Sequence, residues 1–199
     1  KLTPEETAAV KRVDDFFSSR LGTDPAGIRE GQEVVTRSVA PAPGKTATVV
    51  DLSGPRAITA LRVKMAFKDR QDQMDTLRKL VLRITWDGQT TPAVWCPLGD
   101  FFGTAPGENL YRSLLAGMTT DGYYAFWYMP FASRALVELV NEGGVEKNVT
   151  FEITHAPLTR PVETFGRFHS KWHRDVYPLP EDRWPDWTVL RTEGRGRFC

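Results

Sequence analysis

The sequence has little cysteine, almost no net charge and no long apolar run, and each of these absences excludes a class of protein. Its two cysteines, Cys96 and Cys199, lie far apart in a chain of 199 residues and predict neither a disulfide framework nor a metal cluster. Twenty-six Lys and Arg against 25 Asp and Glu leave a formal charge of +1, so we expect no nucleic-acid partner. No segment approaches the roughly 20 apolar residues of a membrane helix, and none has the pattern of a signal segment, so no membrane partner is expected either.

Several nucleotide and catalytic motifs are also missing. The sequence contains no nucleophile elbow, no P-loop and no dinucleotide fingerprint, which excludes α/β-hydrolase, kinase-like and Rossmann interpretations. We therefore expect no cofactor. What the chain does have is a high aromatic content of 11%, with six Trp, which is typical of either a β-sandwich core or a sugar-stacking cleft.

The first twenty residues carry the strongest helix signal. The segment Thr3-Pro4-Glu5-Glu6 provides an N-cap, a proline at the first helical position and the capping-box spacing. Apolar residues then recur at helical spacing, and Gly22 is a plausible stop. We expect this helix to pack one face against the rest of the molecule. Residues 22–44 are rich in Gly, Pro and charge and predict a connecting loop, so the sequence divides into a helix and linker over 1–44 and a β-domain over 45–199.

Beyond the linker the hydrophobic period changes from helical to two. Alternating runs predict strands, and Asp87-Gly88 between two of them predicts a tight hairpin. The expected strands cover Thr46–Leu52, Leu61–Phe67, Leu80–Trp86, Thr91–Cys96, Tyr123–Phe131, Ala135–Val140, Val149–Ile153 and Trp187–Arg191. No helix-length pattern is visible between them, which excludes parallel βαβ units. With long irregular excursions over 98–122 and 156–186, the pattern favours an all-β fold, an antiparallel jelly-roll β-sandwich with an N-terminal helix.

Asp100 is the first candidate for a functional role. It lies in the segment PLGDFFG directly after an expected strand, where two glycines allow close backbone approach and the acid could project into a cleft. In the alternative interpretation, Asp100 caps the loop backbone while the two phenylalanines anchor the loop in the core. Glu108 and Asn109 lie in the same excursion and could share a site with Asp100.

The segment FHSKWHRD, residues 168–175, concentrates polar and aromatic groups that could bind a ligand. In an extended conformation His169 and His173 share one side and Trp172 lies on the other. Two histidines alone do not complete a zinc site, so no metal is expected. A sugar site is the better use, because Trp172 offers a stacking face and the neighbouring polar groups can bind hydroxyls. A solvated surface strand anchored by its Trp is the simpler alternative.

Five stretches of the sequence resemble glycoside hydrolase family 172. They are LVLRITWDG (80–88), PLGDFFG (97–103), MPFASRALVELVNEG (129–143), FHSKWHRD (168–175) and EGRGRF (193–198). This family includes α-D-fructofuranosidases, difructose-anhydride-forming enzymes and D-arabinofuranosidases. The resemblance covers about three quarters of the chain, in the family's order.

The resemblance implies a double jelly-roll subunit in a homo-oligomer, a trimer or hexamer, with a carbohydrate substrate. It implies a retaining mechanism in which two carboxyl groups about 5–5.5 Å apart act as nucleophile and acid/base. The family's two glutamates lie in a second jelly roll whose motifs are absent here, so we expect no catalytic residue in this chain and no hydrolysis by it alone. Asp100, His169 and Trp172 match family motifs and are the expected substrate-binding residues.

Two other functions remain open from the sequence. One is a non-catalytic jelly roll that binds carbohydrate or uses its aromatic strand 123–131 for oligomer assembly. The other is a metal-dependent cupin-like enzyme, for which His155, His169 and His173 are the available histidines.

Overall fold

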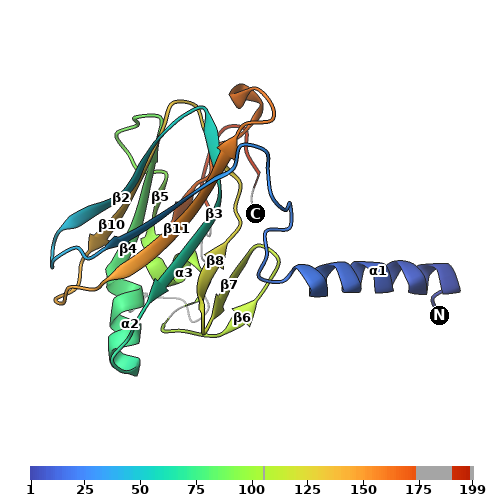
Figure 1. Cartoon of the computed structure of the whole chain (residues 1–199), viewed down its shortest axis with the longest axis horizontal. Helices are drawn as coiled ribbons and strands as arrows, with labels where there is room; N and C mark the ends of the chain where they lie inside the picture. The colour runs from blue at the N-terminus through green and yellow to red at the C-terminus, as the bar shows by residue number, and fades with distance from the viewer. Residues whose placement is uncertain (105, 174–189, 198–199) are drawn as a thin grey trace, which may run out of the picture.

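The alternating segments form two β-sheets in the computed structural model, which describes residues 1–104, 106–173 and 190–197 (Figure 1). The larger sheet has the order β1-β11-β3-β8-β7-β6, with β9 also paired to β3, and the smaller has the order β12-β5-β4-β10-β2. The larger sheet contains β1 (Glu33–Val39), β3 (Arg56–Met65), β6 (Tyr111–Arg112), β7 (Ala116–Thr119), β8 (Gly122–Ala125), β9 (Met129–Phe131) and β11 (Val149–Pro157). The smaller contains β2 (Thr46–Ser53), β4 (Leu80–Trp86), β5 (Val94–Pro97), β10 (Arg134–Asn141) and β12 (Ser170–Lys171).

Eight of these strands pair in a nested order. The first pairs with the last, β1 with β11, and the next pairs inward are β2 with β10, β3 with β8 and β4 with β5, all antiparallel. Successive pairs alternate between the two sheets. This nesting is the eight-stranded jelly roll. The predicted antiparallel jelly-roll sandwich is therefore confirmed.

The core lies between the sheets and contains the apolar half of each alternating pattern. Trp86 and Phe131, one from each sheet, are both fully buried and stack with ring centroids 6.2 Å apart. The indole of Trp86 also donates a hydrogen bond of 2.8 Å to the Phe168 carbonyl. That contact holds the chain after β11 against the sandwich.

The hairpin between β4 and β5 has the backbone that its sequence predicted. Asp87 and Gly88 have φ values of 56° and 72°, as a type I′ turn requires. The Asp87 carboxylate accepts hydrogen bonds from the backbone N–H groups of Ala132 and Ser133 at 2.7 and 2.8 Å. The turn is thereby tied to the segment between β9 and β10.

The prediction of a loop over residues 22–44 is wrong for residues 33–39, which form β1. This strand is the first of the nested eight, so the sandwich begins upstream of Lys45. It was missed because β1 is an edge strand whose side chains are mostly exposed, with only Val35 and Val39 packed against the core. An edge strand that buries so little shows no clear alternation.

Between β3 and β4 the structure has a helix, α2 (Arg70–Lys79), where the sequence predicted no helix. Asp69 caps it by accepting a hydrogen bond from the Asp72 N–H. Only Thr76 and Leu77 are buried, so the apolar stripe that reveals most surface helices is almost missing. The short helix α3 (Leu98–Phe101) and strands β6 and β7 likewise lie within the excursion expected to be irregular, and a 3₁₀ turn covers Val162–Thr164.

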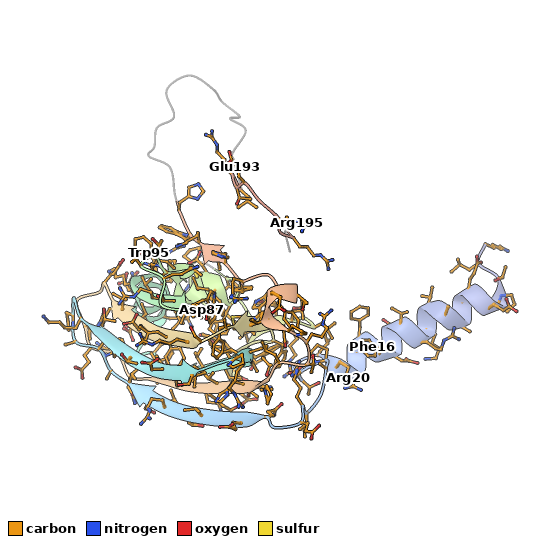
Figure 2. All side chains as sticks on the ribbon, turned by 90° about the horizontal axis from the view of Figure 1, so that it is seen from above. Phe16, Arg20, Asp87, Trp95, Glu193 and Arg195 are labelled. Atoms are coloured by element: carbon orange, nitrogen blue, oxygen red, sulfur yellow. The ribbon has the colours of Figure 1, made fainter. Side chains whose placement is uncertain are left out.

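The last expected strand, Trp187–Arg191, falls mainly on residues outside the described part of the chain; Leu190 and Arg191, which are described, are not in a strand. Residues 190–197 are exposed, and Glu193 and Arg195 lie apart from the sandwich (Figure 2). None of the described helices is long and apolar enough to cross a membrane.

The N-terminal helix α1 (Pro4–Arg20) forms as predicted, with the full capping box between Thr3 and Glu6. The expectation that one face would pack is wrong within the described chain, because α1 has no buried residue and projects from the sandwich (Figure 1). Phe16 and Phe17 are 45% and 46% exposed.

Candidate functional site

Asp100 is positioned by α3, which continues directly from β5. Gly99 allows this helix to pack closely on α2, since a Cβ at Gly99 would lie 2.9 Å from the Leu77 Cβ and 3.0 Å from the Thr104 carbonyl oxygen. Phe101 and Phe102 on either side of the turn are buried in the core. The phenylalanines thus anchor the loop, as the simpler interpretation expected, and leave the Asp100 side chain facing α2.

Three side chains meet at this place, and we call Asp100, Arg78 and Trp172 the corner. Arg78, from the last turn of α2, donates a hydrogen bond of 3.2 Å from Nη1 to Asp100 Oδ1, and the same nitrogen lies 3.1 Å from Oδ2. The Arg78 guanidinium also lies over the Trp172 ring, 5.3 Å from its centroid. An acid, a base and an indole from three separate elements therefore share one surface.

The carboxylate of Asp100 is partly buried and so partly shielded from water. Burial raises its pKa above the ordinary value of 3.8, while the positive charge of Arg78 and the indole of Trp172 oppose the shift. Its Oδ2 is buried and accepts no aligned hydrogen bond from the described residues. Trp172 beside it is 39% exposed.

The corner joins two of the three residues predicted from the sequence. His169 is exposed, and in the described part of the chain no hydrogen bond or ring contact connects it to Asp100 or Trp172. Glu108 also lies apart from the corner: its carboxylate accepts hydrogen bonds from Tyr123 and Gln73. The shared site suggested for Glu108 and Asp100 is not formed.

Arg78 is the corner residue that the sequence did not reveal. Its signal was the basic pair Arg78-Lys79 before a strand, a composition that favours the last turn of a helix. Because α2 itself was not predicted, no residue on it could be placed opposite Asp100.

Behind the corner, Cys96 has no properties of a nucleophile. It is buried, accepts a contact of 3.8 Å from the Ser170 hydroxyl, and burial raises the pKa of its thiol to about 12. Among residues 1–104, 106–173 and 190–197, no three His, Cys, Asp or Glu side chains form a group that could hold a metal ion. The contacts at the corner are a hydrogen-bonded ion pair and the stacking of a guanidinium on an indole.

Most of the chain that forms the fold around this corner matches a known family model. The model, described as GH172 domain-like, matches residues 31–154, from just before β1 into β11. This is more than half of the chain. The chain belongs to the GH172 domain-like family. No curated protein matches it. The match includes the jelly roll and Asp100, whereas Trp172 and His169 lie beyond its end.

Proposed function

We propose that this domain forms part of the substrate cleft of a retaining glycoside hydrolase that acts on furanosides, either fructofuranosides or arabinofuranosides. The family relationship supports a glycosidase. The two glutamates that such a mechanism needs belong, in this proposal, to another part of the protein, and the chain binds the sugar without cleaving it.

The corner carries this proposal. A sugar ring has an apolar face and a rim of hydroxyls, and it needs an exposed aromatic face next to fixed donors and acceptors. Trp172 supplies the face, Arg78 the donors and Asp100 the acceptor. A hydroxyl donated to an ionised carboxylate makes a charge-assisted hydrogen bond, which is stronger than one between neutral groups.

Titration of the ¹⁵N-labelled chain with methyl furanosides of fructose and arabinose tests the proposal. We expect the Trp172 indole N–H signal to shift with a furanoside and to stay in place with methyl glucopyranoside. Asp100→Asn keeps the shape but removes the charge, and should weaken binding about tenfold. His169→Ala, at an exposed residue apart from the corner, is the matched control and should bind like the wild type.

Three results would contradict the proposal: no shift at Trp172 with either furanoside, equal loss in His169→Ala and Asp100→Asn, or release of free sugar by the chain itself. The last would place catalytic groups within these residues.

A second role, assembly of a homo-oligomer, is favoured by α1. Its apolar side chains include Val10, Val13, Phe16 and Phe17, and all four are exposed. A second copy of the same helix is the occupant we propose, because an antiparallel pair sets Glu5 and Glu6 of one copy beside Arg20 of the other. Light scattering of the chain should give a multiple of 22.4 kDa. Phe17→Glu should reduce that mass, and a monomeric wild type would refute this role.

A further inference from the structure

The outer face of the five-stranded sheet carries a hollow of about 360 Å³. Side chains of β4 and β10 form its floor and walls, and the β4–β5 hairpin forms its rim; the lining includes Arg83, Thr85, Gln89, Arg134, Leu136 and Glu138. This volume is within the range of small-ligand sites. None of its lining residues belongs to the corner, so the hollow is a separate feature.

Ion pairs fix the polar groups of the hollow. Glu138 accepts a hydrogen bond of 2.9 Å from Arg83, and only 14% of the Glu138 side chain is exposed. Arg134 donates two hydrogen bonds to Asp51, at 2.7 and 2.6 Å. Each pair sets guanidinium donors beside carboxylate acceptors with no net charge. Adjacent hydroxyls on one sugar ring can accept hydrogen bonds from the guanidinium groups and donate hydrogen bonds to the carboxylates. An anion would instead be repelled by the carboxylate of each pair.

An exposed indole extends this face beyond the hollow. Trp95 on β5 is the register partner of Arg83 on β4, so both side chains project from the same side of the sheet. Trp95 is 51% exposed, and Figure 2 shows it at the surface of the sandwich, away from α1. The neighbouring strand β12 is held there partly by Lys171, which donates a hydrogen bond to the Pro92 carbonyl. A half-exposed indole on a strand gains little from the core and is available to stack on a ligand.

These observations fit one class of ligand. The hollow is lined mainly by polar groups, which excludes an apolar ligand, and its charges are paired, which disfavours an anionic one. From β10 across β4 to β5 the face spans about 10 Å, since neighbouring strands lie about 4.8 Å apart. That length accommodates more than one sugar ring. We propose that the outer face of the five-stranded sheet, from the hollow to Trp95, binds a neutral oligosaccharide independently of the corner.

The experiment titrates the ¹⁵N-labelled chain with three neutral tetrasaccharides, a fructan, an arabinan and a glucan, and with a uronic-acid tetrasaccharide as an anionic comparison. At least one neutral probe should shift the Trp95 indole N–H and Arg83 Nε–H signals. Trp95→Ala should weaken that binding about three- to tenfold, the range for a lost aromatic contact. The matched control is Val34→Ala, which truncates an exposed apolar residue on β1 of the other sheet and should leave the Trp95 site unchanged.

A melting curve for each variant shows whether it is folded, and Trp95→Ala, at an exposed position, should melt like the wild type. The proposal is overturned if no neutral tetrasaccharide shifts these signals or if the anionic one binds more tightly. It is also overturned if Trp95→Ala has no effect, or if Val34→Ala weakens the same binding equally. A mass in light scattering that falls in Trp95→Ala without sugar present would identify the face as an interface between copies and would likewise refute the proposal.

Because the two sites have different reporter signals, this test and that of the corner fail separately. A furanoside that shifts Trp172 but not Trp95 supports the corner alone, and the reverse supports this face alone.

Discussion

The jelly roll and α1 differ in where their apolar side chains lie. In the jelly roll, Trp86, Phe131 and Phe151 are fully buried between two sheets, whereas Phe16 and Phe17 of α1 are almost half exposed. Strong local signals nevertheless predicted elements in both regions, the Asp87-Gly88 hairpin in the jelly roll and the capped helix α1. The comparison teaches that a strong local signal, such as the capping box of α1, fixes the type of an element but not whether it packs.

The largest test of this difference removes one ring from each region. Trp86→Ala deletes a fully buried ring, leaves a cavity and leaves the Phe168 carbonyl without its donor, so the free energy of unfolding should fall by about 3–5 kcal/mol. Phe16→Ala changes a side chain on a helix without buried residues and should alter that free energy by less than about 0.5 kcal/mol. Urea unfolding followed by circular dichroism measures both. Similar losses in the two variants would mean that α1 is part of the cooperative core.

A smaller effect is expected at the Asp87 turn, where hydrogen bonds rather than buried aromatic side chains stabilise the jelly roll. The carboxylate accepts backbone hydrogen bonds between β9 and β10 and one of 2.9 Å from Arg167. Asp87→Asn keeps the left-handed turn conformation but removes the charge, and should reduce the free energy of unfolding by about 2–3 kcal/mol. The exposed Asp121→Asn is the matched control and should stay within about 0.5 kcal/mol of the wild type.

The effect of Asp87→Asn should also depend on pH. Burial acts to raise the pKa of Asp87, but the donors from Ser133, Arg167, Arg134 and Ala132 outweigh it, and the net shift is below 3.8. A lowered pKa gives stability that is complete above the ordinary value and is lost as the pH falls through the folded value. The gap between wild type and variant should therefore close in acid. A gap that stays constant from pH 7 to pH 2 would show that the charge is not responsible.

The sequence predicted the fold well where burial is strong and poorly where it is weak. The alternation in Leu61–Phe67 overlaps the second half of β3, and that in Leu80–Trp86 coincides with β4, because the apolar residues of each run face the core. Strand β1 and helix α2 were missed for the same physical reason, since each buries only a few side chains. A periodic pattern records burial, so an edge strand or a mostly solvated helix leaves little of it.

The site was harder to predict because its residues come from distant parts of the chain. Asp100 and Trp172 were recognisable as residue types suited to sugar, but their partner Arg78 lies on the helix that had no apolar stripe. His169 was grouped with Trp172 because both match a family motif, whereas the structure leaves His169 exposed and outside the corner. A surface that several elements build together cannot be derived from the local pattern of any one of them.

A third test uses the edge of the larger sheet, where β1 meets β11. The Nδ1 atom of His155 accepts a hydrogen bond of 2.7 Å from Arg56, which also contacts Glu33 at 2.8 Å. Burial lowers the pKa of His155 below 6.5 and the Arg56 charge lowers it further, with Glu33 opposing. Near pH 6.5 the unfolded chain therefore binds a proton at His155, whereas the folded chain binds it only at lower pH.

Stability from this group is complete above about pH 6.5 and falls as the pH drops toward the lower folded value, below which the dependence flattens. His155→Gln should remove this slope from urea midpoints measured between pH 8 and pH 5. His169→Gln alters an exposed histidine and should keep it. Loss of the slope in His169→Gln instead would place the pH-sensitive contact outside the β1–β11 edge.

The smallest expected effect lies at the start of α1. Thr3→Ala removes the side chain that accepts from the Glu6 N–H and should cost the helix about 1 kcal/mol. Since α1 has no buried residue, this cost should appear as faster hydrogen exchange of its first amides, while the unfolding midpoint of the jelly roll stays unchanged. Glu6→Gln preserves a capping box and should exchange like the wild type. A lower unfolding midpoint of the jelly roll in Thr3→Ala would contradict the independence of the two regions, because it would mean that the helix and the sandwich unfold as one unit.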